Sequence, residues 1–129
     1  LLENGINCKV EPSNVDEDII KRSLLKEGAT PEIISKNLAE LKANKISNKI
    51  PEELVLGADS VIDLDGKIIS KPKSRVEAFN ILREMNGKAH YLISSVCISK
   101  KRKYDLEPNP AQTQQHLYYG QLYRFHFYK

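Results

Sequence analysis

The chain has 129 residues, 40% of them apolar and 29% charged, a composition that is ordinary for one soluble globular domain. Its net charge of +3 comes from lysines scattered along the chain, which favours a solvated surface over nucleic acid as a partner. The apolar runs are short and the amino end lacks a signal-peptide pattern, so neither a membrane span nor a leader is expected. We therefore expect a cytoplasmic protein.

The amino-terminal segment predicts one strand and one helix. Ile6, Cys8 and Val10 alternate with polar residues, which is the period of a half-buried strand. A short helix is predicted from Asp16 to Lys26, with Gly28 as its stop. The residues of this helix that we expect to face the core are Ile19, Ile20 and Leu24.

A second helix is predicted to begin at Thr30 and Pro31. Threonine caps helices well, and proline is preorganised for the first helical position. The residues of this helix that we expect to face the core are Ile34, Leu38 and Leu41.

The central segment predicts a buried strand followed by a hairpin. The continuous apolar run 54–56, which ends at Gly57, is typical of a strand covered on both faces. Residues 61–64 and 67–70 flank the pair Asp65-Gly66, which is a strong hairpin signal.

A third helix and a last strand complete the predicted fold. Ser74 and Glu77 form a capping box for a helix through Met85, and a strand is predicted at residues 91–99. Strands that alternate with helices, together with the hairpin, predict an α/β fold with a mixed sheet and flanking helices. The apolar residues of the third helix that we expect to face inward are Val76, Phe79 and Leu82.

The composition changes abruptly near Tyr104. All four glutamines and seven of the nine aromatic residues fall from that residue on, whereas isoleucine and valine do not occur after it. One interpretation is an aromatic-rich terminal strand or a partner-binding tail. The other, which the lack of a clean period in residues 114–129 favours, is a segment read in the wrong frame or joined from another source. We therefore divide the chain into a partial domain at 1–103 and an atypical tail at 104–129.

Asp59 is the most informative polar residue. It follows a predicted buried strand and a glycine, a position at the carboxyl end of a strand where open α/β sheets bind their ligands. A carboxylate there can bind a metal ion or take a proton from an attacking water molecule. An Asx turn at the strand exit explains the same residue equally well.

Three more residues are candidates for a phosphate or metal site. Glu17 lies in an acidic run at a helix start, where it either helps to bind Mg²⁺ or stabilises the helix dipole. Lys71 precedes Pro72, which restrains its backbone, and Lys42 flanks the buried stripe of its helix. Cations so placed can hold phosphate oxygens, although most lysines are simply solvated. The sequence contains no P-loop or nucleophile elbow, which leaves metal-assisted attack by water.

The order of these pieces resembles the Maf family, also called septum-formation proteins. The similarity covers about residues 1–99. The motifs that carry it, in chain order, are Gly5-Ile6, Val15-Asp16-Glu17, Leu38-Ala39, Lys42-Ala43, Gly57-Ala58-Asp59-Ser60, Gly66 to Lys71-Pro72, and Asn86-Gly87 with His90.

The resemblance implies a nucleoside triphosphate pyrophosphatase that uses Mg²⁺ or Mn²⁺ to hydrolyse a (d)NTP to a (d)NMP and pyrophosphate. It also implies a fold like that of the inosine triphosphate pyrophosphatases, and homodimers in some members. By this analogy Asp59 is the general base, and Glu17 and Asp59 bind the metal. Lys42 and Lys71 contact the phosphates.

The chain departs from the family pattern in three ways. Members begin with an SxSPRR-type loop that grips the triphosphate and continue into a second half with a nucleotide loop. We expect both to lie outside this chain, which would then bind substrate poorly. Ser60 stands where subfamilies commonly carry threonine or glutamine, which predicts a substrate contact by Ser60 and a preference for dTTP or UTP. The alternatives are a catalytically inactive fragment and a nucleotide-binding or interaction module.

Overall fold

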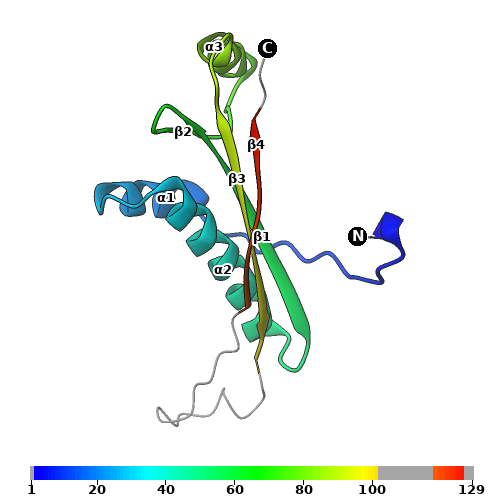
Figure 1. Cartoon of the computed structure of the whole chain (residues 1–129). Coiled ribbons are helices and arrows are strands. Elements are labelled where there is room, and N and C mark those ends of the chain that lie inside the picture. The colour runs from blue at the N-terminus through cyan, green and yellow to red at the C-terminus, as the bar shows by residue number, and fades with distance from the viewer. Residues whose placement is uncertain (1, 102–117, 127–129) are drawn as a thin grey trace.

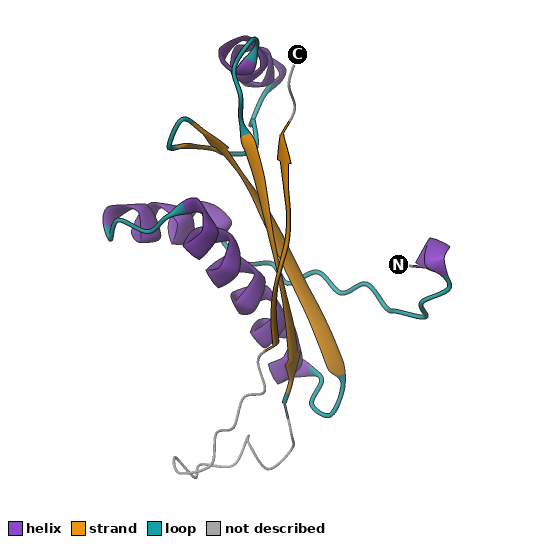
Figure 2. Cartoon of the chain, in the orientation of Figure 1, coloured by secondary structure: helices purple, strands orange, loops and turns teal. Residues whose placement is uncertain are grey.

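A computed structural model describes residues 2–101 and 118–126 of the chain. Its elements are arranged as a twisted sheet with the helices of residues 17–26 and 31–49 on one face and the helix of residues 75–85 beyond one end of the strands (Figure 1, Figure 2). The elements, in chain order, are η1 (Leu2–Asn4), α1 (Glu17–Lys26), α2 (Pro31–Lys49), β1 (Leu54–Leu64), β2 (Lys67–Ile69), α3 (Arg75–Met85), β3 (Tyr91–Lys100) and β4 (Tyr118–His126).

The sheet has the strand order β2-β1-β3-β4. The α/β class with flanking helices is confirmed, and every neighbouring pair of described strands runs antiparallel. A parallel pair needs a crossover that covers one face of the sheet. The connection between β1 and β3 does not do this, because it carries α3 beyond the end of the sheet (Figure 1). No parallel pairing of a mixed sheet therefore occurs among the described strands.

The predicted helix starts and the hairpin are confirmed. Asp16, Thr30 and Ser74 each cap a helix by accepting a hydrogen bond from the backbone N–H three residues on, at 3.2, 3.4 and 3.1 Å. Asp65 and Gly66 join β1 to β2 with φ angles of 51° and 83°. Two consecutive positive φ angles are those of the type I′ turn that an Asp-Gly pair favours.

The core lies between α2 and one face of β1 and β3. It consists of two adjoining clusters of buried residues, and α1 packs against the edge of one of them through Ile20 and Leu24. Burial alternates over residues 54–61 of β1, so that the odd-numbered residues there face α2 and the even-numbered ones face the other way. The largest fully buried apolar side chains of the core are Ile34, Leu38, Val61 and Cys97.

Several apolar residues expected in the core are exposed. Residues 6–10 form no strand, and the described elements cover β1 on one face only. The hydrophobic period identified each helix correctly, but whether an apolar face is covered depends on a tertiary partner that period does not report. The wrongly assigned residues are Ile6, Val10, Ile19, Leu41, Leu54, Leu56, Val76, Phe79 and Leu82.

Helix α2 approaches β1 very closely at Gly57. A Cβ atom at this position would meet the carbonyl oxygen of Ala39 and would lie 2.6 Å from the amide nitrogen of Ala43. The helix presents a stripe of small residues at this contact, spaced four apart and at most 1% exposed. This stripe consists of Ser35, Ala39, Ala43 and Ser47.

We predict that Gly57→Ala lowers the free energy of unfolding by about 1 to 3 kcal/mol or more, because the added methyl group meets backbone atoms that cannot rotate away. Urea denaturation followed by circular dichroism measures the change. Ala58→Val enlarges the neighbouring side chain on the exposed face of β1 and should stay within about 0.5 kcal/mol of the unsubstituted protein. Equal effects of the two substitutions would contradict the close contact.

Candidate functional site

Asp59 lies in the middle of β1 and not at its carboxyl end. Residues 57–60, expected to leave the strand, instead continue to pair with β3 in register, with Asp59 opposite Ser95. Asp59 has the orientation of the odd-numbered residues, so its side chain points beneath α2 and the residue is 7% exposed. The predicted Asx turn at a strand exit is therefore wrong. A carboxylate inside the helix–sheet interface requires a partner of opposite charge.

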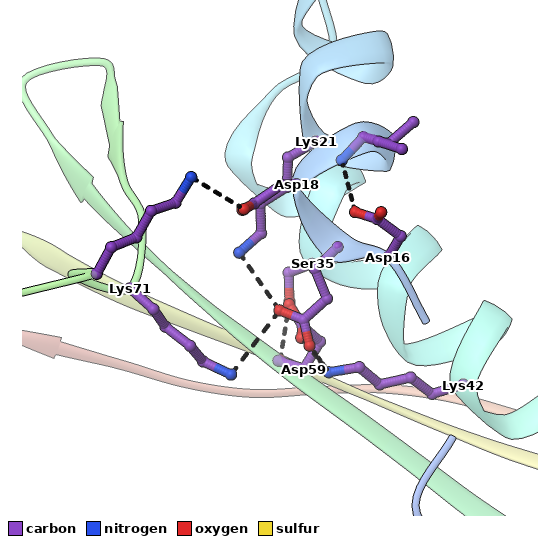
Figure 3. Close-up of polar contacts among 10 residues, drawn as sticks. Asp16, Asp18, Lys21, Ser35, Lys42, Asp59 and Lys71 are labelled. Atoms are coloured by element: carbon purple, nitrogen blue, oxygen red, sulfur yellow. Dashed lines mark hydrogen bonds and ion pairs between the residues drawn. The ribbon is translucent and has the colours of Figure 1, made fainter. Parts of the chain in front are cut away.

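Lys42 supplies that partner. Its ammonium nitrogen lies 2.6 Å from Asp59 Oδ1 and 2.8 Å from Glu17 Oε1. Helix α2 carries Lys42 one residue before Ala43, which packs on Gly57, and the lysine reaches down to Asp59 (Figure 3). Because α1 contributes Glu17 at its first turn, one ammonium group joins three elements of the fold.

Glu17 is also close to two other lysines. Lys21, one turn later on α1, places its nitrogen 3.6 Å from Glu17 Oε2 and is itself buried. Lys71, in the segment that follows β2, lies 3.9 Å from the same oxygen, and its side chain is 86% exposed (Figure 3). Besides Lys42, Glu17 is thus paired with one buried lysine, Lys21, and with one exposed lysine, Lys71.

The charges of the cluster stabilise one another. Burial opposes ionisation of Glu17, but the hydrogen bond from Lys42 and the charges of Lys42, Lys71 and Lys21 outweigh it and lower the Glu17 pKa below 4.5. Burial likewise opposes the charged form of Lys42. Hydrogen bonds and attraction from Asp59 and Glu17 prevail and raise the Lys42 pKa above 10.5. Both groups are therefore ionised at neutral pH.

The backbone of Asp59 is fixed by a buried hydroxyl group. Ser35 Oγ donates to the Asp59 carbonyl oxygen at 3.1 Å and lies 2.8 Å from Ser95 Oγ, so that α2, β1 and β3 are joined behind the carboxylate. Asp59 Oδ2 is buried and has no hydrogen-bond partner among the described residues. The carboxylate thus has one oxygen held by Lys42 and one that is unsatisfied.

Four of the five predicted site residues lie together. Glu17, Lys42, Asp59 and Lys71 form a continuous chain of ion pairs. Ser60 does not join them, because adjacent residues of a strand point to opposite faces. It is exposed on the uncovered face of β1, where its hydroxyl group lies 2.6 Å from Ser94 Oγ.

Sequence reasoning missed two residues of this site. Lys21 stands four residues after Glu17, the spacing at which opposite charges meet on a helix, and that signal was available. Ser35 gave no comparable signal. A small polar residue beside the buried Ile34 shows only that a close contact is possible at position 35. Its role became visible once β1 was placed against α2.

The donor set fits a hard divalent cation that is shared with a ligand. Within residues 2–101 and 118–126, no group of three or more His, Cys, Asp or Glu side chains could hold a metal ion. Glu17 and Asp59 offer two carboxylates, one of them with the unsatisfied oxygen Oδ2. Mg²⁺ commonly uses one or two carboxylates, completed by water and substrate phosphates.

The fold and site define an α/β protein with a buried carboxylate–lysine cluster beneath a helix. A family model described as Maf-like protein matches residues 1–123, and the chain belongs to this family. None of the described helices has the length and apolar character needed to cross a membrane. The domain boundary predicted at residue 103 stays a prediction, although β4 lies in the segment 104–129.

Curated relatives carry pyrophosphatase names. The chain is 74% identical over 100 residues to a nucleoside triphosphate pyrophosphatase from Pelagibacter ubique, a match covering 78% of this chain and 51% of that protein. It is 47% identical over 98 residues to one from a Ruegeria species, covering 76% and 49%. It is 40% identical over 95 residues to a dTTP/UTP pyrophosphatase from Fusobacterium nucleatum, covering 74% and 46%. The chain spans about half the length of these relatives.

We predict that Glu17 stabilises the fold in a pH-dependent way. Its pKa is lower in the folded protein than the ordinary 4.5, so its contribution is present above that value and is lost as the pH falls through the folded-state pKa. The free energy of unfolding should therefore be larger for the unsubstituted protein than for Glu17→Gln at neutral pH. This difference should shrink below pH 4.5. Glu53→Gln, at an exposed position, is the control. A Glu17→Gln difference that stays constant with pH would contradict the ion-pair cluster.

Proposed function

We propose that the protein acts in the hydrolysis of a nucleoside triphosphate to a nucleoside monophosphate and pyrophosphate. The observation that carries the proposal is the buried Asp59 carboxylate, paired to Lys42 and through it to Glu17, in a chain of the Maf-like family. The names of the curated relatives support the reaction. A carboxylate and several ammonium groups are the side chains that this chemistry needs.

In this proposal Glu17, Lys42 and Lys71 each have one task, and Asp59 has two. Asp59 takes a proton as water attacks the α-phosphorus, and the bond from that phosphorus to the pyrophosphate leaving group breaks. Lys42 and Lys71 hold phosphate oxygens and offset the charge that develops on the leaving group. Glu17 and Asp59 would hold Mg²⁺ or Mn²⁺, which would supply neutralisation of phosphate charge and polarisation of the phosphoryl oxygen.

The proposed substrate class is a nucleoside triphosphate, of non-standard or pyrimidine type, and the proposed location is the cytoplasm. Ser60, which is closer to threonine than to glutamine, supports dTTP or UTP, as does the name of the Fusobacterium relative. A 35% identical relative from Rhizobium etli is named 7-methyl-GTP pyrophosphatase. Because Ser60 faces away from Asp59, one ligand on the α2 side of the sheet would not touch both side chains.

Pyrophosphate release from a nucleotide panel with Mg²⁺ or Mn²⁺ tests this proposal. We would compare the chain itself with a chimera in which it replaces the matching half of the Pelagibacter ubique relative. The chimera should release pyrophosphate, and Asp59→Asn should reduce its turnover by about 10²- to 10⁴-fold, the usual contribution of a general base. Release of orthophosphate alone, or an inactive but folded chimera, would refute the proposed reaction.

The same nucleotide panel tests the role of Lys71 and the preference of the site for a nucleobase. Lys71→Met should raise the substrate concentration needed for half-maximal rate, because Lys71 is exposed and its proposed partner is phosphate. Lys49→Met removes the same charge from the exposed end of α2 and should leave the rate unchanged. A preference for 7-methyl-GTP over dTTP and UTP would contradict the inference drawn from Ser60.

A further inference from the structure

Lys42 stands where a bound cation would be expected. Its ammonium group lies 2.6 Å from Asp59 Oδ1 and 2.8 Å from Glu17 Oε1, which are oxygens of the two carboxylates proposed to hold the metal. Mg²⁺ binds oxygen at about 2.0–2.1 Å and carries two charges. A divalent ion and an ammonium group cannot both fill the space between the same two oxygens, because they overlap and repel each other.

The surroundings indicate which group would move. Asp59 is fixed in the middle of β1 by strand pairing and by the hydrogen bond from Ser35, and Glu17 lies in the first turn of α1. Lys42 is attached to the rigid helix α2 by a flexible four-carbon side chain that is 20% exposed. The Asp59 carboxylate is therefore the fixed part of the site, and the ammonium group, which lies at the end of a longer side chain than either carboxylate, is the part that can leave.

We propose that Lys42 is a displaceable counter-ion, which neutralises Glu17 and Asp59 before a divalent cation binds and leaves them when it does. The inference rests on the proposed function, since it concerns the regulation of the same site. It makes Lys42 and the divalent cation competitors for the two carboxylates. It also explains how one lysine can pair with carboxylates in the free protein and with phosphate during turnover.

This exchange sets an order of events. While Lys42 bridges Glu17 and Asp59, two of its three N–H donors are engaged and its charge is offset by two carboxylates, which weakens its attraction for phosphate oxygens. Once displaced, it carries its charge toward the open side of the site, where Lys71 is 86% exposed. The cation and a phosphate group should then bind with positive coupling, because the first releases the lysine that attracts the second.

Mn²⁺ binding to the full chain, measured by electron paramagnetic resonance of the free ion, tests the competition. Removal of the competitor in Lys42→Met should tighten Mn²⁺ binding by at least about fivefold, the lower end of typical coupling between sites. Lys71→Met removes a charge near Glu17 without emptying the space between the carboxylates, and should have a smaller effect. Lys49→Met changes the net charge equally on the same helix and should have none.

A second measurement uses the unsubstituted chain and so does not depend on the folding of a variant. Acylation of lysines, followed by mass spectrometry, should modify Lys42 faster at saturating Mn²⁺, because its two short hydrogen bonds have been released. The rate at Lys49 should not change. A Lys42 rate that stays constant while Mn²⁺ is bound would overturn the proposal, as would weaker Mn²⁺ binding by folded Lys42→Met.

The outcomes separate this proposal from the proposed function. Pyrophosphate release by the chimera, together with an unchanged acylation rate at Lys42, would refute the exchange and support the hydrolysis. Faster acylation of Lys42 with Mn²⁺, in a chimera that releases no pyrophosphate, would support the exchange and refute the hydrolysis. If neither the chain nor Lys42→Met binds Mn²⁺, the cation site itself is absent and the exchange is overturned.

Discussion

The close contact between α2 and β1 at Gly57 is the constraint on which the rest of the structure depends. Side chains normally separate a helix from the sheet on which it packs. Here a glycine on the strand meets a stripe of small residues on the helix, so that backbone lies against backbone. This contact fixes the distance between helix and strand. Lys42 is next to Ala43, and Asp59 is two residues after Gly57, so the contact also brings these two side chains together across the interface. The polar site is thus a product of tight apolar packing.

The fold could be predicted from the sequence where local chemistry decides it. The caps at Thr30 and Ser74, the Asp-Gly turn and the strand at residues 91–99 follow from single residues and short spacings, and all were predicted correctly. The predictions failed where a face needs a partner from elsewhere. The apolar residues of α3, with Phe79 60% exposed, have the period of a buried helix but no such cover among the described residues. The α2 stripe also went unrecognised, because serine and alanine carry little hydrophobic signal.

The candidate site could be predicted in its membership but not in its geometry. The motifs that resemble the Maf family identified Glu17, Lys42, Asp59 and Lys71, which the structure brings together. Asp59 was expected at a strand end because Gly57 resembled a stop. The glycine instead continues the strand at the point of contact with the helix, so that the aspartate is buried and not displayed at a rim. No local sequence pattern distinguishes a glycine that ends a strand from a glycine that lets a helix pack closely against the strand.

Because the hairpin is short, β2 covers only a small part of the outer edge of β1. Strand β2 pairs only with Ile62, Asp63 and Leu64, so among the described strands the stretch from Leu54 to Val61 has no neighbour on that side. Its backbone N–H and C=O groups form an edge flanked by the exposed apolar side chains Leu54 and Leu56. Edges of this kind template the addition of further strands from other chains. This edge is therefore the place on the described sheet where a further strand, from the same chain or from another, can add by β-pairing.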